Sequence, residues 1–211
     1  GYSSAASDVY KRQDENVIYT EDMKTLVVYR PEGVIEYLNL APRKLQTGTS
    51  MLKGYNVALE FIDRVQVMPK SIADNLYLAD VKQKGLDFTY SFNMMYEGYR
   101  LQLSEEMKAN LGMDALVQVV VRGTDVIEAH FSTLEVVPKE VGLKALNTHY
   151  LEPIDKMYTL FEKQGIEDFM IDHLELVYLL EGIGEDIDMT WGAVYDHKWY
   201  YPLIMRQIPG F

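Results

Sequence analysis

Residues 86–96, LDFTYSFNMMY, alternate large apolar side chains with small or polar ones over eleven positions. Successive residues of a strand point to opposite faces, so this pattern predicts a β-strand with one buried and one wet face. The apolar stripe comprises Leu86, Phe88, Tyr90, Phe92, Met94 and Tyr96. The opposite stripe comprises Asp87, Thr89, Ser91 and Asn93.

A helix is predicted just before this strand, over residues 50–65. Its apolar positions recur with helical spacing, and Ser50 is available as the N-cap. We expect these positions to pack on the apolar stripe: Leu52, Tyr55, Leu59 and Ile62. After the strand come a turn at Glu97-Gly98, a second strand, a short polar helix and a hairpin around Gly123. Residues 49–137 thus form a first helix-plus-meander module.

The same plan recurs in residues 138–211, which we predict to be a second helix-plus-meander module. Pro153 marks a helix start and Gly165 its end. Two alternating strands follow at 171–180 and 187–196, and a last strand contains Pro202. The helix's apolar positions are Ile154, Met157, Tyr158 and Phe161.

Upstream of both modules, Pro31-Glu32-Gly33 separates two β-rich runs and predicts a hairpin within a lead-in of residues 14–48. Residues 1–13, GYSSAASDVYKRQ, show no hydrophobic period and resemble a translated sequencing adapter. We interpret them as a non-native scar, with the true N-terminus missing. The predicted fold class is α+β: two helix-on-antiparallel-sheet modules preceded by a β-hairpin.

Composition narrows the classes of partner and chemistry. The 211 residues carry 32 acidic and 20 basic side chains, a formal net charge of -12, which repels the phosphates of nucleic acid. The absence of Cys removes disulfides, thiolate metal sites and thiol nucleophiles. No apolar run approaches the roughly 18 residues that a membrane span needs.

No motif in the sequence predicts catalysis, a cofactor or a metal. The four histidines, His130, His149, His173 and His197, form no metal-binding pair such as HExxH. The loop 181–188, EGIGEDID, is rich in carboxylates but lacks the calcium-loop spacing, so we interpret it as a hairpin loop. We therefore expect no enzyme activity and no catalytic, cofactor or metal residue.

Aromatic side chains are dense near the C-terminus, in WGAVYDHKWYYPL at residues 191–203. They tile a sheet face beneath the second helix, or some are exposed and contact a protein or glycan partner. Alternation places Tyr200 opposite Trp199 and Tyr201, so at least one of these rings leaves the core. The predicted partner-binding residues are Trp199, Tyr200 and Tyr201.

The order of elements, the strand and turn pattern from Phe88 to Leu101 and the terminal Tyr/Trp series resemble the extracytoplasmic regions of YycH/YycI-type proteins. Related PepSY-like modules of sporulation and germination proteins have similar helix-on-sheet units. The resemblance implies a non-enzymatic regulator of a WalK-type sensor histidine kinase in a Gram-positive bacterium. Its partners would be that kinase and a related YycH/YycI-type protein, and its membrane anchor would precede Asp14.

Two other functions stay open. One is a PepSY-like module that binds a ligand or inhibits a peptidase, which an exposed aromatic groove beside the second sheet would favour. The other is a hydrolase of unrecognised type, which would need carboxylates or histidines converging in a concave site with perturbed titration.

Overall fold

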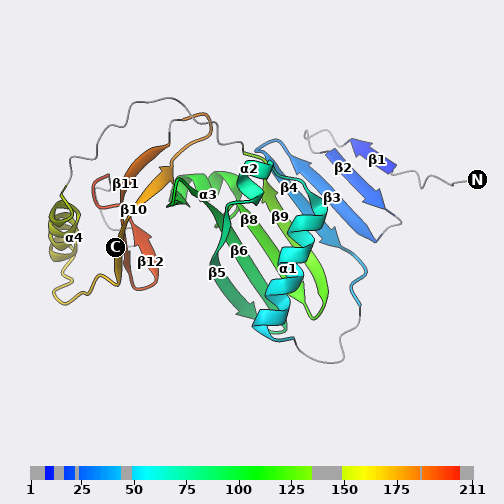
Figure 1. The fold of residues 1–211 in the computed structure, drawn as a ribbon, viewed down its shortest axis with the longest axis horizontal. Coiled ribbons are helices and arrows are strands. Elements are labelled where there is room, and N and C mark those ends of the chain that lie inside the picture. The colour runs from blue at the N-terminus through cyan, green and yellow to red at the C-terminus, as the bar shows by residue number, and fades with distance from the viewer. Residues whose placement is uncertain are drawn as a thin grey trace, which may run out of the picture. The chain divides into compact units, whose positions relative to one another are not determined.

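The computed structural model describes residues 8–11, 17–21, 24–43, 49–134, 149–185 and 187–204. The chain divides into two compact units. The first unit comprises Gly1–Met95 and Leu103–Val137, and the second unit comprises Tyr96–Gln102 and Pro138–Phe211. Each unit has helices on an antiparallel sheet, which confirms the predicted α+β class (Figure 1).

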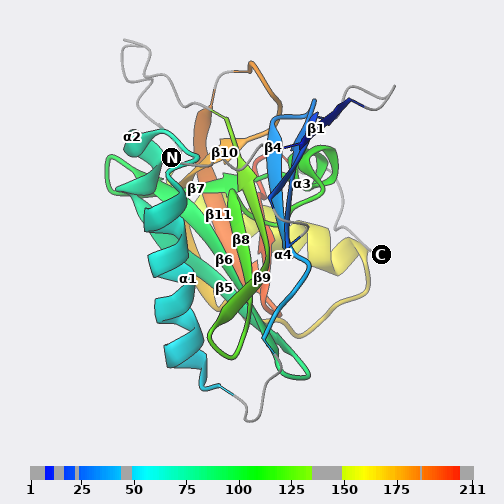
Figure 2. The same cartoon turned by 90° about the vertical axis from the view of Figure 1, so that its right-hand side faces the viewer.

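The sheet of the first unit has the strand order β1-β2-β3-β4-β9-β8-β6-β5, and each neighbouring pair is antiparallel. Figure 2 shows α1 running along one face of this sheet. The strands are β1 (Asp8–Lys11), β2 (Val17–Glu21), β3 (Thr25–Arg30), β4 (Val34–Asn39), β5 (Leu76–Lys84), β6 (Asp87–Tyr96), β8 (Val117–Arg122) and β9 (Asp125–Ser132).

The predicted lead-in hairpin is present as β3 and β4, and it joins the sheet through the pairing of β4 with β9. Strands β2 and β5 were not predicted. Strand β1 lies inside the segment interpreted as a scar, although that segment lacks a hydrophobic period. Residues 1–7, 12 and 13 lie outside the described residues, and the scar remains an interpretation.

Helix α1 (Met51–Val65) begins as predicted, with Ser50 Oγ accepting a hydrogen bond from Lys53 N at 3.3 Å. The predicted buried face was wrong at Leu52, which is 70% exposed, and at Leu59, which is also exposed. It was correct at Ile62, which is buried, and Tyr55 contacts the rings of Tyr90 and Phe92 as expected. The buried positions are Gly54, Ala58, Phe61 and Ile62.

Small residues face the sheet in the part of α1 that lies over the rings of β6, because those rings already fill the space. Tyr90 is fully buried, and its Oη donates a hydrogen bond to the carbonyl oxygen of Met51 at 2.6 Å. A side chain larger than hydrogen at Gly54 would run into that hydroxyl. The close approach of helix and strand thus selects Gly54 and Ala58 over leucines.

The apolar stripe of β6 is buried over its middle, from Phe88 to Met94, whereas Leu86 is exposed. The polar stripe was expected to be wet, and this was wrong at Ser91 and Asn93, each 3% exposed. Asn93 Oδ1 accepts a hydrogen bond from Leu116 N at 3.0 Å. Since β6 lies between β5 and β8, neighbouring groups satisfy its short polar side chains.

Two short helices complete the first unit: α2 (Lys70–Ala73) and α3 (Glu105–Leu111). The predicted polar helix is α3, capped by Ser104 Oγ, which accepts from Met107 N at 3.0 Å. Its apolar side chains Met107 and Leu111 are buried.

The second unit has the strand order β7-β10-β11-β12. Its elements are β7 (Tyr99–Leu103), α4 (Leu151–Lys163), β10 (His173–Leu180), β11 (Asp188–Tyr195) and β12 (Lys198–Tyr200). Helix α4 buries Pro153, Met157 and Phe161, and Gly165 follows its end with a φ of 74°. None of the described helices is both long enough and apolar enough to span a bilayer.

Candidate interaction surface

The strand register of the second unit divides its aromatic residues between two faces. Ala193 pairs with both Leu174 and Tyr200, so these three residues share the face that α4 covers. Val194 pairs with Trp199, which places that ring on the opposite face. The prediction that Tyr200 and Trp199 lie on opposite faces of the sheet is therefore confirmed.

Tyr200 lies in the core of the second unit and is 4% exposed. It packs with Met157, Phe161 and Ala193, and its ring centroid lies 5.9 Å from that of Phe161. Burial, with a smaller contribution from Tyr195, raises the pKa of the Tyr200 hydroxyl. In this structure Tyr200 offers almost no surface to a partner.

Trp199 lies half-buried over the backbone of Gly192, where its ring occupies the space that a Cβ would need. An added Cβ would lie 2.7 Å from Trp199 Cζ3 and 3.3 Å from Val177 Cγ2. Strands β11 and β12 are joined by the turn at Asp196-His197, whose φ angles of 48° and 60° fit the type I′ turns of β-hairpins. Because residue 192 is glycine, the Trp199 ring can pack directly against the backbone of β11.

Tyr201 follows the end of β12 and is half-buried, and Pro202 after it is buried. Two of the three predicted partner-binding residues, Trp199 and Tyr201, therefore keep part of their rings at the surface. The partner-binding role of all three remains a prediction.

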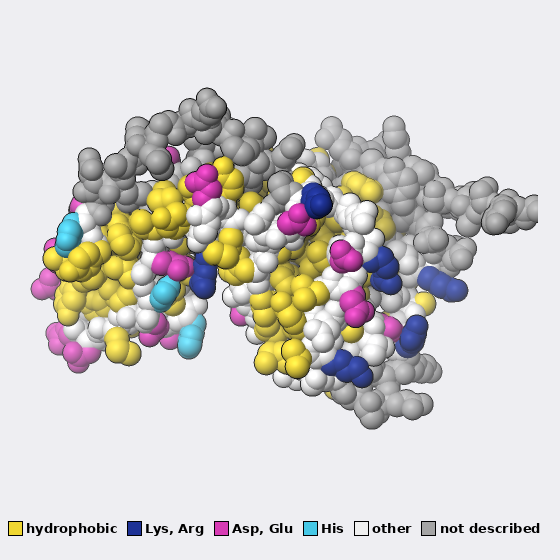
Figure 3. All heavy atoms as spheres, viewed as in Figure 1, with side chains coloured by type: hydrophobic (Ala, Val, Ile, Leu, Met, Phe, Trp, Pro, Cys, Tyr) yellow, Lys and Arg dark blue, Asp and Glu magenta, His cyan; other side chains and the backbone are white. Residues whose placement is uncertain are grey.

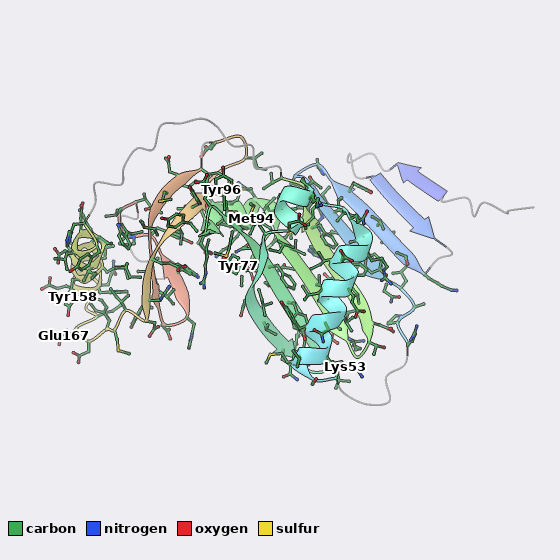
Figure 4. The ribbon with its side chains drawn as sticks, viewed as in Figure 1. Lys53, Tyr77, Met94, Tyr96, Tyr158 and Glu167 are labelled. Carbon is green, nitrogen blue, oxygen red and sulfur yellow. The ribbon has the colours of Figure 1, made fainter. Side chains whose placement is uncertain are left out.

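A second aromatic group was missed in the sequence, because its members lie on distant segments. Tyr178 on β10 contacts Tyr96 and Tyr99, with ring centroids 5.5 Å and 6.1 Å away and interplanar angles of 69° and 88°. Figure 4 labels Tyr96. Burial, followed by the charge of Glu97, raises the pKa of Tyr178. Only the alternation of each strand could have predicted that these rings share a face.

Charge is concentrated in the second unit. Residues 149–204 contain 12 Asp and Glu against three Lys, a net charge of -9, while the rest of the chain contains 20 acidic against 17 basic residues. On the face drawn in Figure 3, Lys and Arg gather over the first unit, and the second unit shows a broad hydrophobic area bordered by acidic side chains. This surface favours apolar and cationic groups of a partner.

Two of the four histidines lie beside carboxylates. His173 Nε2 lies 3.0 Å from Glu175 Oε2, while Glu175 Oε1 lies 3.4 Å from Arg100 Nη1 without a hydrogen bond. His130 Nε2 lies 2.7 Å from Glu128 Oε1 on the polar face of the first sheet.

Within the described part of the chain, no group of three or more Asp, Glu or His side chains is arranged to hold a metal ion. The loop EGIGEDID joins β10 to β11, as predicted from its position between alternating strands. Asp186 of that loop lies outside the described residues, and the absence of a calcium site stays a prediction.

Comparisons with solved structures identify the fold. The chain resembles an uncharacterized protein from Eubacterium rectale (TM-score 0.56, 12% identity, 90% of this chain and 67% of that one). It also resembles YycH from Bacillus subtilis (TM-score 0.51, 11% identity), of which it spans 43% while 88% of this chain is covered. The C-terminal domain of YpeB from Bacillus megaterium gives a TM-score of 0.48 at 12% identity, over 92% and 79% of the two chains.

These likenesses confirm a YycH-like fold, as the element order predicted. No protein-family model matches the sequence, and no curated protein is significantly similar to it. At such low identity the shared fold says nothing of activity.

Proposed function

We propose that the chain is a non-enzymatic protein-interaction module that works outside the cytoplasmic membrane and adjusts the activity of a sensor histidine kinase. The carrying observation is the second unit, which combines partly exposed aromatic rings with a net charge of -9 over residues 149–204. Surfaces of this composition supply large contact area at low entropic cost and select partners by charge.

The YycH-like fold supports this proposal, because YycH/YycI-type proteins, which the sequence resembles, regulate WalK-type kinases. The proposed partners are the kinase and a second protein of the YycH/YycI type. The proposed anchor is an N-terminal segment that precedes Asp14.

The proposed contact residues are Trp199 and Tyr201, which keep part of their rings accessible. Tyr200 has a different role in this proposal: it holds β12 against α4 through Phe161. Removing Tyr200 would then weaken binding only by loosening the strand that presents its neighbours.

The test uses the source organism's WalK-type kinase reconstituted in lipid vesicles, with the purified chain added on the extracytoplasmic side. We expect the wild-type chain to change the autophosphorylation rate, and the double variant Trp199→Ala, Tyr201→Ala to lose the effect. The matched control is Tyr29→Ala, which removes an exposed ring from the first unit. Circular dichroism and melting curves establish that each variant is folded.

A wild-type chain without effect on autophosphorylation would contradict the regulatory proposal. Turnover of an ester, peptide or glycoside by the purified chain would contradict its non-enzymatic character.

A further inference from the structure

A hollow of about 330 Å³ opens on the second unit where α4 meets the loop that follows it. We call it the α4 hollow, and its lining residues are Tyr158, Glu167, Asp168, Phe169 and Met170. Figure 4 shows Tyr158 on α4 with Glu167 close by on the following loop. None of these residues belongs to the surface around Trp199.

Two aromatic rings that contact each other line one side of the α4 hollow. The ring centroids of Tyr158 and Phe169 lie 4.7 Å apart at an interplanar angle of 58°. Phe169 is fixed from behind by Phe161, 4.3 Å away, and by Tyr195, 6.1 Å away. Phe169 is thus anchored in the core, while Tyr158 is 59% exposed.

Carboxylates stand directly beside these rings. Glu167 and Asp168 are both exposed and immediately precede Phe169, and Met170 after it is 74% exposed. The faces of aromatic rings carry negative charge density, which attracts cations, and the carboxylates add to this attraction. An anion would be repelled by the same groups.

The loop sequence explains why these groups meet. Gly165, with a φ of 74°, ends α4 and turns the chain back toward the helix. Ile166 and Phe169 then pack into the cluster around Met157 and Phe161. Since Phe169 points inward, the adjoining acidic residues are left at the rim.

We propose that the α4 hollow binds the cationic side chain of a Lys or Arg residue on a protein partner. This proposal rests on the proposed interaction function and names the chemistry of the partner. The charge of the second unit is complementary to such a partner, since residues 149–204 hold only three basic residues against 12 acidic ones. The ammonium or guanidinium lies over the accessible face of the Tyr158 ring, and Glu167 and Asp168 neutralise it.

The test follows the ¹³C-labelled methyl group of Met170 by NMR in the full chain, with its signal assigned by its loss in Met170→Leu. The probes are acetyl-Gly-Lys-Gly-amide, its Arg counterpart and the uncharged norleucine counterpart. We expect saturable shifts with the Lys and Arg peptides that weaken with added salt, and none with norleucine. The stronger of the two cationic peptides identifies the preferred side chain.

Three variants separate the contribution of the Tyr158 ring from that of the two carboxylates. Tyr158→Leu keeps an apolar side chain but removes the ring, and we expect it to weaken binding by about two- to fivefold. The double variant Glu167→Gln, Asp168→Asn should weaken it further in low salt. The matched control is Tyr150→Leu, which removes an exposed ring near the other end of α4 and should leave the affinity unchanged.

Equal shifts with the Lys and norleucine peptides, or an unchanged affinity in Tyr158→Leu, would overturn the proposal. The kinase assay is a separate readout. Peptide binding without any effect on autophosphorylation would support the α4 hollow and overturn the regulatory function. Kinase regulation without saturable peptide binding would support the regulatory function and overturn the proposal for the α4 hollow.

Discussion

The two units use aromatic residues in opposite ways. In the first unit, Tyr90 and Phe92 on β6 are almost fully buried, and the helix above them approaches through glycine and alanine. In the second unit, α4 packs on Ala193 and Tyr200, while Trp191 and Tyr178 on the same face are only half-buried. In the first unit these rings stabilise the core, whereas in the second unit part of their surface stays accessible to solvent.

Negative charge is densest in one part of the second unit, because residues 149–204 carry -9 of the formal charge of -12. A surface with exposed rings and one sign of charge is unfavourable for an isolated protein. In the proposed function, the second unit therefore provides the surface that a partner recognises.

The largest effect is expected in the core of the first unit. Phe92 is 1% exposed, so Phe92→Ala should lower the free energy of unfolding by about 3–5 kcal/mol. Leu52→Ala is the control on α1 and should have an effect within about 0.5 kcal/mol. Urea unfolding measures both, and similar losses at the two positions would show that the assigned helix face is wrong.

Gly54→Ala sharpens the comparison, because alanine normally stabilises a helix interior by about 1 kcal/mol. Here the new methyl group would meet the buried hydroxyl of Tyr90, which is held by Met51. We expect a destabilisation of about 1–3 kcal/mol by urea unfolding. A stabilised variant would mean that α1 lies farther from the sheet than the structure shows.

Gly192→Ala is the corresponding test in the second unit. The added methyl group would displace the Trp199 ring, which is half-buried and has room to move, so the loss should be about 1 kcal/mol. Gly182→Ala is the control, since only the exposed Glu185 side chain must shift there. Tryptophan fluorescence should change in Gly192→Ala alone. An unchanged spectrum would contradict the packing of the Trp199 ring against Gly192.

The smallest effect concerns pH. Burial raises the pKa of Tyr90 in the first unit and of Tyr200 in the second above the ordinary value of 10.0. The unfolded chain then loses these protons first, so the free energy of unfolding falls as the pH rises above 10. Tyr200→Phe should flatten this decline in urea titrations between pH 9 and 11. A decline as steep as that of the wild type would contradict the burial of Tyr200.

The sequence correctly predicted strands and helices that have a distinctly apolar face. It was wrong about the burial of side chains whose surroundings come from distant parts of the chain. The buried stripe of β6 from Phe88 to Met94 and the start of α1 at Ser50 were both correct. The inward face of α1 was wrong at Leu52 and Leu59, because hydrophobicity favours leucines and says nothing of the space above Tyr90. Ser91 and Asn93 were expected in water for the same reason: their partners Gln118 and Leu116 come from another part of the chain.

The candidate surface was predicted in part. Alternation correctly separated Tyr200 from Trp199, yet only the position of α4 shows which of the two is in the core. The α4 hollow was not predicted, since Tyr158 has the spacing of a core residue and is exposed. Its role depends on Phe169, which lies in a loop without any periodic pattern.

Site-specific photo-crosslinking to the kinase and to the YycH/YycI-type partner tests the central claim most directly. The photoreactive amino acid p-benzoylphenylalanine replaces Tyr158, Trp199 or Tyr201 in the second unit, and Tyr29, Leu52 or Leu78 in the first. The account predicts partner adducts from the second unit and few or none from the first. Adducts that form equally well from both units, or mainly from the first, would contradict the assignment of recognition to the second unit.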